Sequence, residues 1–173
     1  MTPLPLDLEW RCAAPADVPR MLEIQRACYG EAFLESGALL LRRLAAAPGT
    51  SWVALRAGRV QAYLAAYPSR LGRLTPLHGE FEPAAAPDTL YLHDLAVHPE
   101  AAGAGLGPRL VARALEQARR DGLRHSGLVS VQASHAFWQR QGYADHALAQ
   151  ARQRQRLASY PGAARYMARA LAG

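Results

Sequence analysis

The sequence predicts an α/β domain, and three observations support this fold class. The chain has 173 residues and half of them are apolar, which is enough for one substantial hydrophobic core. An apolar strand at 90–97 runs into a turn with glycines at positions 103, 105 and 107. A helix follows, because apolar residues recur at helical spacing from 108 to 118. We therefore expect a single domain over 1–173, organised around this strand, turn and helix.

The first half of the chain predicts a strand, two helices and a hairpin. In order, these elements are a strand at 7–13, a helix at 17–29, a helix at 36–47, and strands at 51–56 and 60–68. Asp17 is assigned as the N-cap of the first helix, and Gly30 ends that helix. Ala57-Gly58-Arg59 is short enough to join the two strands as a hairpin.

The second half continues with alternating strands and helices. In order, these are a strand at 89–98, a helix at 107–120, a strand at 127–132, a short helix at 134–141, a strand from 142 and a closing strand at 164–171. Gly122 is expected in the left-handed cap position of the long helix, and Ser134 is expected to cap the short one. The predicted element order is β-α-α-β-β-β-α-β-α-β-β.

Two stretches predict no regular element. Residues 69–88 hold Gly, Pro and Ala without periodicity, and a loop of this length is usually functional or mobile. Its acids, Glu80, Glu82 and Asp88, leave two interpretations open: an approach for a cationic amine, or a solvated acidic loop. The polar stretch after residue 143 carries Arg152, Arg154 and Arg156, which we interpret as a solvated loop.

Composition narrows the function classes. The formal net charge is +6, and all 20 positive side chains are arginine, scattered along the chain, so we expect no nucleic-acid partner. We expect no membrane span and no signal peptide, because no apolar run is long enough and the first residues lack a basic flank. Cys12 and Cys28 are not at metal-ligand spacing, so we expect reduced thiols, no metal and a cytoplasmic location.

The glycine turn points to a phosphate-bearing ligand. Glycine lets the backbone approach a ligand closely, and the free N–H groups at a helix start favour an anion. No Gly-Lys-Ser/Thr follows the glycines, so the turn is not a Walker loop. The spacing Gly103-x-Gly105-x-Gly107 also differs from the dinucleotide fingerprint. On its own this spacing equally suits a tight strand-to-helix connection.

Two motifs carry a resemblance to a known family. Residues 92–99 (Leu-His-Asp-Leu-Ala-Val-His-Pro) and 103–107 (Gly-Ala-Gly-Leu-Gly) resemble the acetyl-CoA signature of the GCN5-related N-acetyltransferases (GNAT). Residues 134–143 (Ser-His-Ala-Phe-Trp-Gln-Arg-Gln-Gly-Tyr) resemble the second motif of that family. Ala102 stands where the family usually has Arg or Gln, and Trp138 stands where it usually has Tyr.

The resemblance implies a fold and a cosubstrate. The implied fold is a mixed, mostly antiparallel sheet of six to seven strands with splayed central strands, flanked by about four helices. The cosubstrate is acetyl-CoA, with its pantetheine arm paired to the central strand and its pyrophosphate on the glycine turn. The residues implied to bind it are Leu95, Ala96, Val97, Ala102, Gly103, Ala104, Gly105, Leu106, Gly107, Pro108, His135, Phe137 and Trp138.

The implied reaction is acetyl transfer to the primary amine of a small molecule or peptide, by direct attack in a ternary complex. A protonated amine needs a base before it can attack, and the tetrahedral oxyanion needs a donor, here the main-chain N–H of Ala96 or Leu95. The run from 92 to 98 resembles the arylalkylamine N-acetyltransferase branch, in which the histidine at the position of His93 takes part in deprotonation. We favour His93 as the base, with Asp94 second. Strand alternation places the two on opposite faces unless a bulge disturbs it.

The general acid is left open, because an indole at Trp138 cannot protonate a thiolate. Tyr91 is the first candidate, with Tyr143 and Tyr166 as others, and water is the remaining possibility. The rival hypothesis is a catalytically weak module that binds CoA or serves in regulation. For the acceptor we name Tyr29, Glu31 and Phe33 as candidate contacts, and the family also implies a possible homodimer.

Overall fold

The computed structural model describes residues 8–172, so residue 7 of the expected first strand lies outside the described residues. One sheet organises the molecule, with strand order β1-β2-β3-β4-β5-β7-β6. Its strands are β1 (Leu8–Cys12), β2 (Trp52–Arg56), β3 (Arg59–Ser69), β4 (Thr89–Val97), β5 (His125–Ser130), β6 (Ala144–Asp145) and β7 (Arg165–Ala170). Neighbours pair antiparallel except β4 and β5, which run parallel. The predicted mixed, mostly antiparallel sheet is confirmed.

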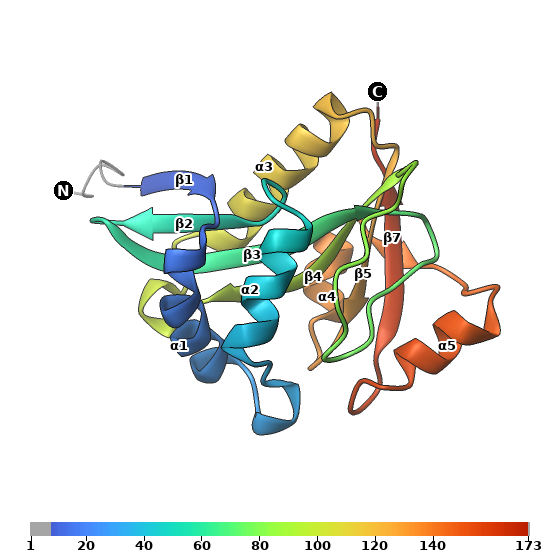
Figure 1. The fold of residues 1–173 in the computed structure, drawn as a ribbon, viewed down its shortest axis with the longest axis horizontal. Coiled ribbons are helices and arrows are strands. Elements are labelled where there is room, and N and C mark those ends of the chain that lie inside the picture. Colours follow the sequence, from blue (N-terminus) through green and yellow to red (C-terminus); the bar gives the residue numbers. More distant parts are fainter. Residues whose placement is uncertain (1–7, 173) are drawn as a thin grey trace.

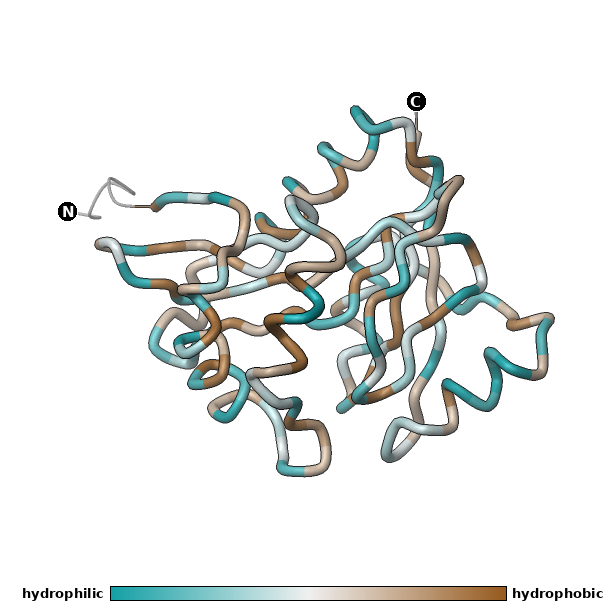
Figure 2. Tube along the Cα trace, viewed as in Figure 1, coloured by the Kyte–Doolittle hydropathy of each residue, from teal (hydrophilic) through white to brown (hydrophobic). Residues whose placement is uncertain are grey.

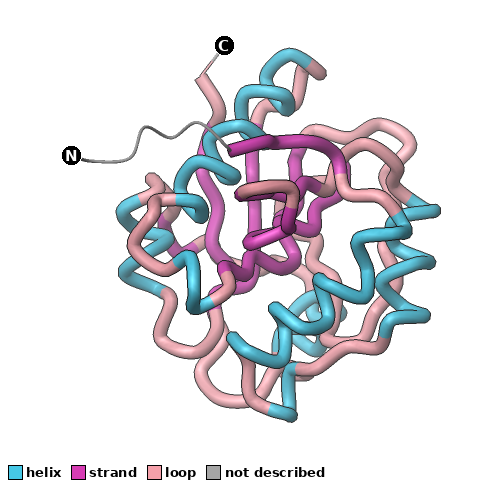
Figure 3. Tube along the Cα trace, turned by 90° about the vertical axis from the view of Figure 1, so that its left-hand side faces the viewer, coloured by secondary structure: helices cyan, strands magenta, loops and turns pink. Residues whose placement is uncertain are grey.

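Helices cover both faces of this sheet (Figure 1; Figure 3). They are α1 (Val18–Cys28), α2 (Gly37–Ala46), α3 (Leu106–Arg120), α4 (His135–Arg140) and α5 (Ala151–Leu157). The apolar face of α3, with Leu110 and Ala114, packs on Leu64 and Leu92 of the sheet in one buried cluster. Helix α1 packs on the opposite face, where Met21 joins a second cluster. None of the described helices is long and apolar enough to cross a membrane.

The caps of two helices differ from the expectation. Asp17 stands at the N-cap position of α1, but its carboxylate accepts from the Arg11 guanidinium at 2.7 Å and from the N–H of Ala14. Ser134 precedes α4, but its hydroxyl lies 3.0 Å from that of Ser130. Both side chains tie the helix start to the preceding strand instead of capping a helix N–H group, and for Asp17 the charged Arg11 is the stronger partner.

The arginine-rich stretch after residue 150 is a helix, and the expectation of a loop there is wrong. Helix α5 is short and mostly hydrophilic, which Figure 2 shows as a largely teal coil at the lower right. Its one buried residue is Gln153, whose side chain accepts from the N–H of Leu74 at 3.0 Å, and Arg156 donates to the carbonyl of Leu74 at 3.0 Å. Side-chain bonds to a distant loop therefore stabilise this helix in place of an apolar stripe.

The long connection between β3 and β4 has no helix or strand in the part that the structure describes, as expected. It is nevertheless anchored, because Leu74 and Phe81 are buried in a cluster with Tyr67 and Tyr91 of the sheet. This connection covers the face of the sheet beside α2, next to the carboxyl end of β5 (Figure 1). It therefore forms one wall of the region where β4 and β5 separate.

Candidate functional site

The two parallel strands separate halfway along their length. Strands β4 and β5 pair from Thr89 with His125 to Leu92 with Leu128, and no register pair follows within the described residues. Strand β4 continues to Val97 and β5 to Ser130, so a gap opens between them. The expected splayed central strands are thus present. An unpaired strand edge of this kind offers backbone groups to an extended ligand.

A bulge lies at the point where the gap begins. Along β3 and β4, Ala66 pairs with Leu92 and Ala65 pairs with Asp94, so His93 is an extra residue without a register partner. Leu92 belongs to the cluster under α3, and Leu95 packs against that cluster. His93 and Asp94 both contact groups of the opposite face, so the bulge places the two candidate bases on one side. The expected alternation does not separate them.

His93 is held by a buried carboxylate that comes from the α1–α2 connection. Its Nε2 lies 3.0 Å from Oε1 of Glu35, and Arg43 of α2 forks onto the same carboxylate at 2.6 and 2.8 Å. Only 1–5% of each of the three side chains is exposed. Burial favours the neutral acid, but hydrogen bonds from His93 and Arg43 outweigh it and hold the pKa of Glu35 well below its ordinary value. The group is therefore a carboxylate.

The charge of Glu35 determines which nitrogen of the His93 imidazole carries the proton. A carboxylate only accepts hydrogen bonds, so the proton of His93 lies on Nε2. In the neutral ring the lone pair is then on Nδ1, which is buried and has no hydrogen-bond partner among the described residues. The N–H of His78 also donates to Glu35, at 2.9 Å, and Arg43 donates to the carbonyl of Gly79. The long β3–β4 connection is thereby tied to the same carboxylate.

Asp94 lies in a different environment from Glu35. Its carboxyl accepts a hydrogen bond from the Tyr63 hydroxyl, and the nearby Tyr29 hydroxyl also favours the ionised carboxylate. Burial raises the pKa of Asp94, although these two tyrosines and the nearby His93 act in the opposite direction. A carboxylate with a raised pKa is a stronger base than an ordinary one. Tyr29 also donates to the carbonyl of Leu95 at 2.9 Å, at the edge of the gap.

Three cavities meet around these residues. A cavity of about 160 Å³ fills the gap, lined by His93, Asp94 and Tyr29 on one side and by Phe137 and Trp138 of α4 on the other. A small one of about 30 Å³ adjoins it on the side of Glu35 and Phe33. The largest, of about 490 Å³, lies beyond the end of β5. Trp138 and Phe137 therefore line the gap, whereas His135 lines the largest cavity.

The glycine turn lies at the start of α3. Gly103 and Gly105 have φ of 80° and 74°, and Gly105 is the N-cap residue. The first N–H groups of the helix, such as that of Leu106, have no intrahelical partners, which suits an anion. Pro108 has no N–H and contributes only its fixed backbone angle. Gly107 instead packs inward, since a Cβ there would lie 3.6–3.8 Å from Val97, Leu95 and Phe137. Ala102 and Ala104 complete the turn.

Family comparison agrees with this geometry. The model of the acetyltransferase (GNAT) family matches residues 18–143. The chain belongs to this family. No curated protein sequence matches the chain.

Solved GNAT structures share the fold at low identity. Ard1 from Thermoplasma volcanium is 16% identical, with a TM-score of 0.73 over 96% of this chain and 99% of that one. The ribosomal-protein-S18-alanine N-acetyltransferase from Escherichia coli is 16% identical, with a TM-score of 0.67 over 96% and 95%. The PaiA N-acetyltransferase from Thermoplasma acidophilum, solved in complex with coenzyme A, is 13% identical, with a TM-score of 0.66 over 94% and 98%.

In this GNAT chain the expected tyrosines lie away from the gap. The Tyr91 hydroxyl is directed at the carbonyl of Thr75 at 3.5 Å, and Tyr91 lines none of the three cavities. Tyr143 donates to Ser126 at 2.7 Å in the core, and the Tyr166 hydroxyl accepts from the N–H of Gly72 at 3.0 Å. None of the three reaches the gap, so the structure does not support Tyr91 as a catalytic residue.

The acids of the β3–β4 connection do not line the cavities either. Glu80 pairs with Arg42 at 2.7 Å, and Asp88 accepts from Thr89 and from the N–H of Leu71. The interpretation of this loop as an approach for a cationic amine is therefore not supported. Two residues that the sequence did not single out as catalytic, Glu35 and Tyr29, lie beside the gap, and only their distant contacts could have indicated them.

Proposed function

We propose that this GNAT protein transfers an acetyl group from acetyl-CoA to the primary amine of a small molecule or peptide, by direct attack in a ternary complex. The observation that carries the proposal is the bulge at His93, which brings His93 and Asp94 to one side of β4 where β5 diverges. A cytoplasmic location and a possible homodimer are part of the same proposal. Membership of the family supports the reaction class.

The cosubstrate fits the gap and the glycine turn. The open edge of β4, with Leu95, Ala96 and Val97, suits main-chain pairing with the pantetheine arm. Positive φ at Gly103 and Gly105 turns the chain toward the start of α3, whose first N–H groups suit the pyrophosphate. The short side chain of Ala102 adds no contact, so main chain carries this recognition.

We assign to Asp94 the role of the base that removes the proton from the amine. Asp94 lines both the gap and the small cavity beside it, as His93 does, and its raised pKa makes it a better proton acceptor than an ordinary carboxylate. His93 is less suited to direct contact, because its side chain is 1% exposed and its Nε2 is bound to Glu35. In this assignment His93 is a neighbour whose orientation is fixed by its contact with Glu35.

The remaining steps need a donor for the oxyanion and a proton for the thiolate. The main-chain N–H of Ala96 or Leu95, on the unpaired edge, is the candidate oxyanion donor. Tyr29 is the candidate acid, since it lines the gap and its hydroxyl proton lies at the Leu95 carbonyl on the edge of the gap, although burial and the nearby Asp94 raise its pKa. The Tyr29 proton would pass to the sulfur, and the proton taken from the amine by Asp94 would restore the tyrosine.

Thiol release from acetyl-CoA tests the proposal. The amine panel contains hexylamine, 1,6-diaminohexane, 6-aminohexanoate and a set of short peptides with free N-termini, and the product mass is measured in each case. Release above the hydrolysis background, with an N-acetylated product that is lost in Asp94→Asn, is the expected result. Thermal stabilisation by acetyl-CoA without turnover of any amine would overturn the catalytic proposal and support the CoA-binding module.

A further inference from the structure

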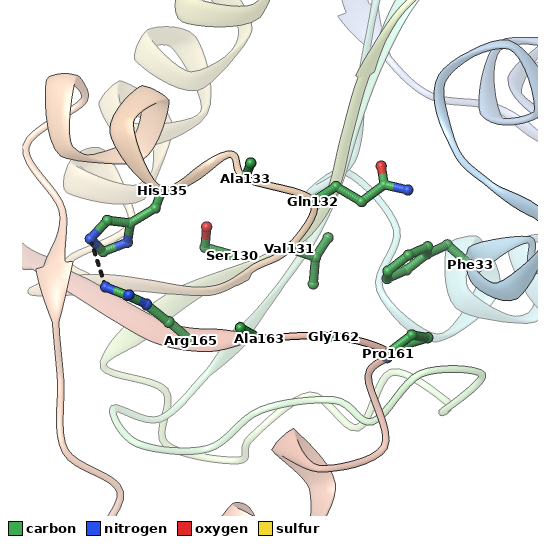
Figure 4. Close-up of a pocket in the computed structure, with 10 residues that line it drawn as sticks. All are labelled: Phe33, Ser130, Val131, Gln132, Ala133, His135, Pro161, Gly162, Ala163 and Arg165. Atoms are coloured by element: carbon green, nitrogen blue, oxygen red, sulfur yellow. Dashed lines mark hydrogen bonds between the residues drawn. The ribbon is translucent and has the colours of Figure 1, made fainter.

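The largest cavity lies where an acceptor could extend away from the reacting amine. It is bounded by Phe33 of the α1–α2 connection, by Val131 and Gln132 after β5, and by Pro161 and Arg165 at the start of β7. Val131 and Gln132 also line the gap cavity, so the two spaces adjoin. Figure 4 shows Phe33 and Pro161 at one end and Arg165 with His135 at the other. One end is thus apolar and the other is polar.

The polar end carries positive charge. Among the described residues that line this cavity, Arg165 is the one with a permanent charge, and no acidic side chain lines it. Nη1 of Arg165 lies 3.2 Å from Nε2 of His135 and 3.4 Å from Asp145, which is itself outside the lining. Because the guanidinium can only donate, Nε2 of His135 is the acceptor in this contact.

One edge of this guanidinium is open. Within residues 8–172, Nε and Nη2 of Arg165 make no hydrogen bond, and the side chain is 53% exposed. Two parallel N–H donors on one edge match the two oxygens of a carboxylate. The pairing with Asp145 occupies the other side and holds the side chain, while exposed pairs of this kind are weak. The open edge is therefore positioned to receive an anion.

The acids nearer the reacting groups do not offset this charge. Glu35 is neutralised by Arg43 and His93, and the acids of the β3–β4 connection lie outside the cavity lining. A second cation on the acceptor would therefore meet Arg165, whose charge is offset only in part by its exposed pair with Asp145. The distance between the two ends also matters. Strand β7 lies two strands from β4, which would place the chain positions of Arg165 and Asp94 roughly 10 Å apart if all strands stayed paired, and they lie farther apart because β4 and β5 separate after Leu92.

We propose that the acceptor is an amine that carries a carboxylate several bonds from its reacting nitrogen, bound at the open edge of Arg165. This inference rests on the proposed function, because it names the substrate class of the same site. The amine would lie at Asp94 in the gap, and the chain between the two groups would cross Val131 and Phe33. An α-amino acid, with its carboxylate next to its amine, is too short to reach both.

Three amines with the same six-carbon chain test the proposal. 6-Aminohexanoate, hexylamine and 1,6-diaminohexane end in a carboxylate, a methyl group and an ammonium group. We expect kcat/KM to be roughly 10- to 100-fold higher for 6-aminohexanoate than for hexylamine, and lowest for the diamine. Arg165→Gln should bring the first ratio close to one, mainly through KM. Arg165→Lys, which keeps a point charge but loses the fork, should retain part of it.

Arg152→Gln is the matched control, since it removes one positive charge from an exposed position of α5 and should keep the preference. Equal kcat/KM for the three amines, or an unchanged preference in Arg165→Gln, would overturn the proposal while leaving N-acetylation established. A rise in KM confined to acetyl-CoA would also overturn it, because Arg165 would then serve the cosubstrate. Absence of turnover with every amine is the separate failure of the proposed function.

Discussion

Nε2 of His93 lies 3.0 Å from Oε1 of Glu35, although 58 positions separate the two residues in the sequence. The contact joins the central strand to the connection between α1 and α2, and Arg43 completes a buried group of three hydrogen-bonded side chains. The Gln25 side chain of α1 also donates to the carbonyl of Glu35 and accepts from its N–H. The wall of the gap is therefore fixed by a side-chain network, with Glu35 at its centre.

Glu35→Gln should destabilise the fold by about 3–5 kcal/mol at neutral pH, because it leaves the Arg43 charge buried without its partner. The folded-state pKa of Glu35 is lowered, so its contribution is complete above the unfolded value near 4.3 and is lost as pH falls through the folded pKa. Urea unfolding at several pH values measures this. Glu80→Gln, which breaks the exposed pair with Arg42, should cost less than about 1 kcal/mol. Equal losses in the two variants would contradict the prediction.

Asp94→Asn should make the protein more stable and less active. Burial raises the folded-state pKa of Asp94, so its ionised form opposes folding at pH 7 by about 1.4 kcal/mol for each pKa unit. The gain should disappear below the unfolded value near 3.9, where both states are protonated. We expect kcat to fall roughly 10²- to 10⁴-fold. Thermal unfolding and thiol release check the two parts, and a variant with nearly full activity would remove Asp94 as the base.

The activity of the unchanged protein should decline at acid pH for the same reason. Catalysis requires the ionised Asp94, so kcat/KM should fall as pH decreases through the raised folded-state pKa. A pH profile of kcat/KM measures the midpoint of this decline, provided that the spectroscopic signal of thiol release does not itself change with pH. A profile that is flat down to the ordinary carboxyl range would show that no group of raised pKa takes part.

Tyr29→Phe should lower kcat by roughly 10- to 100-fold and leave the KM for acetyl-CoA nearly unchanged, since the hydroxyl acts on the departing thiolate. Tyr143→Phe is the matched control, because it also removes a buried hydroxyl, bonded to Ser126 at 2.7 Å, but does so in the core. The control should lose stability by about 1 kcal/mol and keep its kcat. If both variants keep full kcat, then water must supply the proton.

Gly105→Ala should raise the KM for acetyl-CoA severalfold. Gly105 and Gly58 have the same φ of 74°, and a Cβ at either position meets nothing within 4 Å, so alanine strains both turns equally. Gly58→Ala, in the β2–β3 hairpin, should therefore lose about 1 kcal/mol of stability without an effect on KM. Titration of acetyl-CoA against both variants compares them. Similar KM values would indicate that the glycine turn is a connection without a binding role.

The sequence predicted the individual strands, α1 to α4 and the turn at Gly105 from local patterns, whereas the arrangement of the strands in one sheet came from the family resemblance. The sequence allowed for a bulge near His93 but could not place it, and it did not predict the helix over 151–157. A bulge adds one residue to a strand and has no characteristic residue pattern. The alternation rule alone therefore placed His93 and Asp94 incorrectly on opposite faces. Helix α5 lacks an apolar stripe, and the bonds of Gln153 and Arg156 to Leu74 stabilise it from a distant part of the chain.

The candidate site was predicted where main chain defines it and missed where distant side chains do. His93, Asp94 and Trp138 line the gap, as their motifs suggested. Tyr91 shares the face of His93, but strand position does not say where a hydroxyl ends, and this one is directed at Thr75. Glu35 had no local signal, since its role depends on a contact across the fold.

The sheet has two portions, β1-β2-β3-β4 and β5-β7-β6. Among the described residues, the four register pairs from Thr89 to Leu92 are the only strand pairing that joins them. Mechanically, these pairs act as a hinge, and the two portions of the sheet diverge from it. A ligand that fills the gap between β4 and β5 acts as a strut, because it contacts both strands at a distance from the paired residues. Amide exchange should therefore slow on both strands when acetyl-CoA is present, and slow at the paired residues least of all.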